Sequence, residues 1–127
     1  MPPPPPVVVL LEDQAELGRV IREVLGEAGM EVIQVRAAED AVTTIRERDV
    51  AFVVSDLPSL GREHGDPLAP ISSTYPDLPI IVIRDKRDDD VPFFGAWREE
   101  GSRLLLRRPF RIDDLVSATR ELLKSTG

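Results

Sequence analysis

Asp49-Val50-Ala51-Phe52-Val53-Val54-Ser55-Asp56 is the stretch of sequence that decides the fold, an apolar run closed by an acid. Valine and phenylalanine favour strands, and the run has no polar residue at every second position. This pattern predicts a strand buried on both faces, as in a parallel sheet covered by helices. Asp56 then lies at the sheet edge where ligands bind. Alternatively, Asp56 only starts a turn at 57–59, because aspartate also favours turns.

Four further segments are predicted to be strands, one of them an alternating edge strand at 31–36; the others are 7–11, 78–83 and 104–106. Helices are predicted between them from apolar residues at three- and four-residue steps. They run from Gln14 to a stop at Gly29, over 38–45, over a short stretch at 67–75, over 92–100 with Asp90 as cap, and over 112–123. Five strands alternating with five helices define a doubly wound α/β domain.

Length and charge restrict the class of protein. The chain has 127 residues, which is enough for one compact domain. We expect a disordered proline tail over 1–6 and the domain over 7–125. The net charge of -7 disfavours nucleic acid and anionic membranes as partners. The apolar run at 7–11 is too short for a signal peptide or a membrane span, so we expect a cytoplasmic protein.

Acidic residues follow the first strand as well as the third. Asp13 suits the N-cap of the first helix, but capping does not explain Glu12 beside it. No glycine-rich phosphate fingerprint follows this strand, which disfavours a nucleotide site of the Rossmann or P-loop type. Arginines stand at the ends of the fourth and fifth strands, as Arg84 and Arg107-Arg108. The sequence therefore predicts a cluster of charged residues at one sheet edge.

From Val7 to Leu123 the chain resembles response-regulator receiver domains, the CheY-like family of two-component signalling. The features that carry the resemblance are Glu12-Asp13, Asp56, Leu78-Pro79 and Arg108-Pro109-Phe110. The resemblance implies a flavodoxin-like (βα)5 fold with strand order 2-1-3-4-5. It also implies that Asp56 accepts a phosphoryl group from a histidine kinase, and that Glu12, Asp13 and Asp56 bind Mg²⁺. The ion would offset the repulsion between a carboxylate and a dianionic phosphoryl group.

The sequence departs from the family pattern at the ends of the fourth and fifth strands. Arg84 stands where the family has Thr or Ser, Arg108 where it has Lys, and Leu105 where it has an aromatic switch residue. Three carboxylates and two guanidinium groups would leave one net negative charge, so we expect weak Mg²⁺ binding. The residues leave two positions open for Arg84, either in the pocket or turned outward to the acids at 88–90.

Three functions are consistent with these residues. The first is an atypical receiver that works as a signalling interaction module and not as an enzyme, with phosphorylation of Asp56 impaired. The second is an ordinary receiver that is phosphorylated on Asp56 with Mg²⁺. The third is a small α/β hydrolase or phosphatase with Asp56 as nucleophile. Haloacid-dehalogenase-like enzymes want a second acid at the position of Pro58, which disfavours the third function.

The resemblance also indicates where partners would bind. Receiver-like proteins use the fourth helix, fifth strand and fifth helix for partners and dimers. Here that region offers Phe93, Phe94 and Trp97. Exposed aromatic clusters mark binding surfaces. We therefore predict that a histidine kinase, another signalling protein or a second copy of the chain binds there.

Overall fold

The structure is a computed structural model that describes residues 4–12, 14–55, 68–84, 97–100, 103–107 and 111–126. Strands and helices alternate along the first part of the chain. The strands are β1 (Val7–Leu11), β2 (Glu31–Val35), β3 (Val50–Ser55), β4 (Ile80–Arg84), β5 (Trp97–Glu100) and β6 (Arg103–Arg107). The helices are α1 (Ala15–Glu27), α2 (Ala38–Glu47), α3 (Ala69–Thr74) and α4 (Ile112–Thr126).

The strands form one sheet with the order β2-β1-β3-β4-β6-β5. The strands β2, β1, β3, β4 and β6 are parallel, and β5 pairs with β6 in the antiparallel direction. Taken in chain order, the parallel strands have the order 2-1-3-4-5, so the predicted doubly wound topology is confirmed. The predicted edge position of β2 and the short helix α3 are confirmed as well.

The prediction of a helix over 92–100 is wrong at its carboxyl end. Trp97–Glu100 is strand β5, with Trp97 opposite Leu106 and Glu100 opposite Arg103. Only Gly101-Ser102 separates the two strands in the sequence, a length and composition typical of a hairpin. Pairing with a neighbouring strand outweighs a weak helical preference. The expected aromatic residues Phe93 and Phe94 lie outside the described residues.

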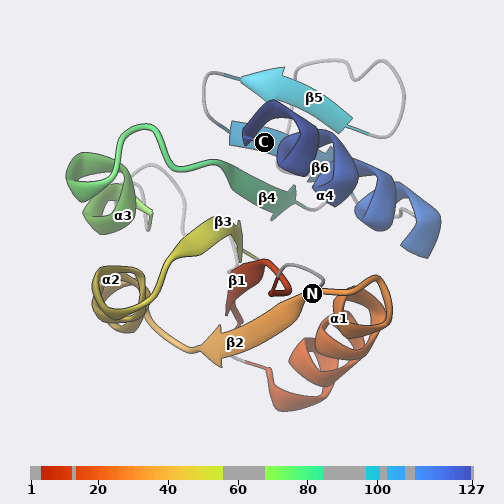
Figure 1. Cartoon of the computed structure of the whole chain (residues 1–127), viewed down its shortest axis with the longest axis horizontal. Coiled ribbons are helices and arrows are strands. Elements are labelled where there is room, and N and C mark those ends of the chain that lie inside the picture. Colours follow the sequence, from red (N-terminus) through yellow and green to blue (C-terminus); the bar gives the residue numbers. More distant parts are fainter. Residues whose placement is uncertain are drawn as a thin grey trace.

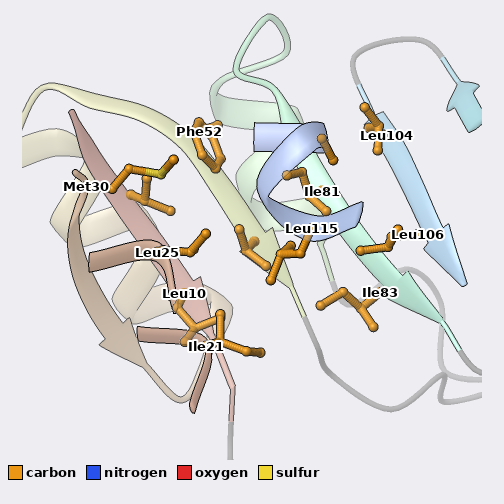
Figure 2. Close-up of a cluster of buried hydrophobic side chains, with 13 residues drawn as sticks. Leu10, Ile21, Leu25, Met30, Phe52, Ile81, Ile83, Leu104, Leu106 and Leu115 are labelled. Carbon is orange, nitrogen blue, oxygen red and sulfur yellow. The ribbon is translucent and has the colours of Figure 1, made fainter. Parts of the chain in front are cut away.

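Two apolar clusters hold the helices against the two faces of the sheet. Alternate residues of β1 divide between them, because successive side chains of a strand point to opposite faces. α1 and α4 cover one face, and α2 and α3 cover the other (Figure 1). The cluster under α1 and α4, drawn in Figure 2, consists of Val8, Leu10, Ile21, Leu25, Met30, Phe52, Val54, Ile81, Ile83, Leu104, Leu106, Leu115 and Ala118. The second consists of Val9, Leu11, Ala38, Ala41, Val53, Leu68, Ile71, Ile80 and Val82.

Helix α1 ends as the sequence predicts, at Gly29. The φ angle of Gly29 is 95°, which glycine adopts without the strain that a Cβ would introduce. The Met30 N–H donates to the Leu25 carbonyl at 3.1 Å, and the Gly29 N–H donates to the Gly26 carbonyl at 3.0 Å. Leu25 and Met30 also share the first apolar cluster. These contacts form a Schellman motif, which turns the chain from α1 into β2.

The start of the chain joins the sheet through its backbone. Pro4 to Pro6 have no regular secondary structure, and the Pro6 carbonyl accepts a hydrogen bond from the Glu31 N–H at 2.9 Å. This bond extends the contact between the first two strands by one residue. Residues 1–3 lie outside the described residues, so the disorder of the proline tail stays a prediction.

Candidate functional site

The carboxyl ends of β1 and β3 meet at one edge of the sheet. Leu11, the last residue of β1, lies opposite Ser55, the last residue of β3. Glu12 and Asp56 are the residues that follow these two in the sequence. Asp13 and Asp56 lie outside the described residues, and their roles as metal ligand and phosphoacceptor stay predictions. Glu12 is the acid of this set whose surroundings the structure describes.

Glu12 is buried, with 1% of its surface exposed. Its N–H donates to the Val35 carbonyl of β2 at 3.0 Å, and its carbonyl accepts a hydrogen bond from Nε2 of Gln34 at 3.3 Å. The Oε1 atom of its carboxylate accepts a hydrogen bond from the Gln14 N–H at 2.9 Å. Burying a carboxylate is costly unless it is hydrogen-bonded. The contacts from β2 and from the start of α1 therefore fix this acid at the sheet edge.

The N-terminus of α1 differs from the prediction that Asp13 is its cap. Gln14 has extended backbone angles (φ -98°, ψ 116°) and is the N-cap residue, without a hydrogen bond from its own side chain. Glu12 supplies the side-chain acceptor near this terminus, through the hydrogen bond to the Gln14 N–H. A buried carboxylate three residues before the first helical residue, Ala15, satisfies the N–H of the N-cap residue. This contact explains why Glu12 lies against the helix start, where a negative charge is favourable.

Gly18 and Gln34 are parts of the site that the sequence reading missed. A Cβ atom built on Gly18 would lie 2.5 Å from Cδ and 2.6 Å from Oε1 of Gln34. Glycine at position 18 therefore makes room for the Gln34 side chain between α1 and the end of β1. The signal in the sequence is a glycine inside an amphipathic helical pattern, which often has a packing reason.

The basic ends of β4 and β6 lie side by side. Arg84, the last residue of β4, pairs with Arg107, the last residue of β6. β4 in turn is the neighbour of β3. The side chain of Arg84 and all of Arg108 lie outside the described residues, so the predicted roles of both arginines stay predictions. The backbone nevertheless places the Arg84 position on the strand beside β3 and the Arg107 position one strand further away.

Glu12 supplies at this edge the kind of ligand that a hard divalent cation takes. Mg²⁺ prefers oxygen ligands and is usually bound by one or two carboxylates. A carboxylate has about four lone-pair positions, so the Glu12 side chain can accept other contacts besides the hydrogen bond from Gln14. In the part of the chain that the structure describes, no group of three or more His, Cys, Asp or Glu residues is gathered. Glu12 is the member of the predicted metal set whose position is described.

Known proteins share this fold. No protein-family model matches the chain. The C4-dicarboxylate transport transcriptional regulatory protein DctD of Rhizobium meliloti (strain 1021) is 26% identical over 111 residues, which are 87% of this chain and 24% of that protein. A response regulator receiver domain protein from Clostridium thermocellum has a TM-score of 0.74 at 19% identity, covering 95% of this chain and 96% of that one. A chain from the structure of the histidine kinase ThkA in complex with the response regulator protein TrrA has a TM-score of 0.68 at 18% identity, covering 93% and 98%.

The chain therefore has the fold of response-regulator receiver domains, and the resemblance predicted from the sequence is confirmed at this level. It spans about a quarter of the length of DctD, so the activity named for DctD belongs to a longer protein. Within the described ranges, no helix combines the length and the apolar character that crossing a bilayer requires.

Proposed function

We propose that the chain is an atypical receiver domain of a two-component pathway, which works as an interaction module and whose phosphorylation on Asp56 is impaired. The observation that carries this proposal is the strand register, which places the backbone of Arg84 opposite that of Arg107 at the ends of β4 and β6. Ordinary receivers have a hydroxyl residue at the position of Arg84, where it helps to hold the phosphoryl oxygens. An arginine there would form an ion pair with a carboxylate such as Asp56, and the paired carboxylate would be a poorer phosphoacceptor.

Glu12, Asp13 and Asp56 are the residues that would hold Mg²⁺ in this domain. The ion, when bound, supplies positive charge that offsets the repulsion between a carboxylate and a phosphoryl group. Glu12 is fixed for this role by its hydrogen bonds to β2 and to the start of α1. The three acids and the guanidinium groups of Arg84 and Arg108 sum to one net negative charge, so the metal binding that we propose is weak.

This sequence also lacks the residues that ordinary receivers use to switch. In ordinary receivers, a phosphoryl group draws the hydroxyl of the fourth strand inward and repacks an aromatic residue of the fifth parallel strand. Arg84 ends β4, and Leu105 is the middle residue of β6. A guanidinium paired with Asp56 would hold the pocket in one state. The domain is therefore locked, and it binds its partner without switching.

An ordinary receiver that is phosphorylated on Asp56 is the second candidate. The observation that favours it is the fixed position of the buried Glu12, which is also what a working Mg²⁺ site requires. Under both candidates the domain is a signalling module rather than an enzyme, and its place of action is the cytoplasm.

The partner in this proposal is a histidine kinase or another signalling protein. The structure of ThkA in complex with TrrA supports a kinase partner for a domain with this fold. The surface that we propose contains β6 and α4, and β5 replaces the carboxyl end of the helix expected there. A homodimer through the same surface is part of the proposal. The net charge of -7 disfavours nucleic acid and anionic membranes.

Mass spectrometry after incubation with acetyl phosphate and Mg²⁺ tests the proposal. We expect no Mg²⁺-dependent gain of a phosphoryl group by the parent protein. The Asp56→Asn variant is the control, because it keeps the shape of the side chain and removes the nucleophile. A gain in the parent that Asp56→Asn loses would replace the first candidate with the second.

A further inference from the structure

Gln34 of β2 reaches the end of β1 although 22 residues separate it from Glu12 in the sequence. Its Nε2 donates to the Glu12 carbonyl at 3.3 Å, and the Glu12 N–H donates to the Val35 carbonyl at 3.0 Å. Both polar groups of the Glu12 backbone are therefore held from β2. Because the backbone sets the direction of the Cα–Cβ bond, these contacts determine where the Glu12 side chain starts.

The space that Gln34 occupies exists only because residue 18 is glycine. A Cβ there would lie 2.5 Å from Cδ and 2.6 Å from Oε1 of Gln34, and no ordinary packing allows this. The side-chain amide would have to leave its place beside α1. Gly18 and Gln34 are thus complementary, and a Cβ at position 18 would displace the amide that donates to the Glu12 carbonyl.

We propose that Gln34 is a positioning residue for the Glu12 carboxylate, and that Gly18 provides the room it needs. That the ligand of this carboxylate is Mg²⁺ rests on the proposed function. Gln34 would act through Glu12, because its amide donates to the Glu12 carbonyl. Outer partners of metal ligands commonly set the orientation of the ligand, and losing one lowers metal affinity about tenfold to a hundredfold.

Amide NMR spectra of the full chain, recorded with and without MgCl₂, test this proposal. Gln34→Met keeps the length of the side chain and removes the donor, whereas Gly18→Ala leaves Gln34 in the sequence and takes its space. Gly26→Ala is the matched control, because among the described residues nothing lies within 4 Å of a Cβ built on Gly26. The Gln14 amide reports the Glu12 carboxylate directly, since its N–H donates to Oε1.

In Gln34→Met and in Gly18→Ala we expect the Gln14 amide signal to move and the Mg²⁺ dissociation constant to rise about tenfold to a hundredfold. Gly26→Ala should match the parent in both measurements. An unchanged Mg²⁺ affinity in Gln34→Met overturns the proposal. If the parent protein itself does not respond to Mg²⁺, the metal role in the proposed function fails, and the Gln14 amide alone decides. Movement of that signal in Gln34→Met then supports the positioning of Glu12, and an unmoved signal overturns it.

Discussion

Replacing Gly18 by alanine should leave the stability of the domain nearly unchanged, because two opposing effects have similar size. A glycine-to-alanine change inside a helix stabilises it by about 0.8–1.0 kcal/mol. The new Cβ would lie 2.5 Å from Cδ of Gln34, so the side-chain amide must move and release the Glu12 carbonyl. Such a hydrogen bond contributes about 0.5–1.5 kcal/mol to stability.

A double-mutant cycle with Gln34→Ala separates these effects. Once the Gln34 amide is gone, Gly18→Ala should stabilise the domain by the full value of about 0.8–1.0 kcal/mol. The coupling between the two substitutions is then about 1 kcal/mol, measured by urea unfolding of the four proteins. Gly26→Ala lies in the same helix, and its effect should be the same with and without Gln34. Effects of Gly18→Ala that agree within about 0.3–0.5 kcal/mol in the two backgrounds would refute the contact with Gln34.

Other changes test the core, the turn after α1 and the charge of the site. Phe52→Ala should lower the free energy of unfolding in urea by about 3–5 kcal/mol, because Phe52 is fully buried between strands and helices; a smaller loss would mean a looser core. Gly29→Ala should cost about 1–2 kcal/mol in the same assay, because alanine is strained at a φ of 95°, and no loss would contradict the left-handed turn. Arg84→Thr should strengthen Mg²⁺ binding in calorimetry by removing a positive charge, and unchanged affinity would place Arg84 outside the pocket. Beryllofluoride with Mg²⁺ should leave the NMR signals of Leu105 and of residues 92–100 unmoved, and long-range shifts would reveal a working switch.

The parallel part of the sheet could be predicted because its inner strands contain apolar runs and β2 alternates as an edge strand does. Val7–Leu11 and Val50–Ser55 are each followed by acids, and parallel pairing brings their ends to one edge. The placement of Glu12 at that edge follows from these patterns alone. The hydrogen bond from Gln34 does not follow from them, because it depends on the register between β1 and β2 and on the space above Gly18.

β5 does not follow from the sequence because the stretch 92–100, whose last four residues form it, is ambiguous. Phe93, Phe94 and Trp97 suit a strand as well as the apolar face of a helix, and Pro92 suits the first turn of a helix. Gly101 suits a helix stop, although the pair Gly101-Ser102 is also typical of a hairpin. A pairing partner at β6 decides between the two, and a single segment of sequence does not contain that information.

The addition of β5 changes which strands can fray. In the described sheet, β2 and β5 are the outermost strands, so β1, β3, β4 and β6 each have a paired strand on both sides. These four are the strands whose carboxyl ends form the candidate site. Backbone amides in doubly paired strands open only with larger, costlier fluctuations than those of an edge strand. Their hydrogen exchange should therefore be slower than that of β2 and β5, and the charged residues would sit on the most slowly exchanging part of the sheet.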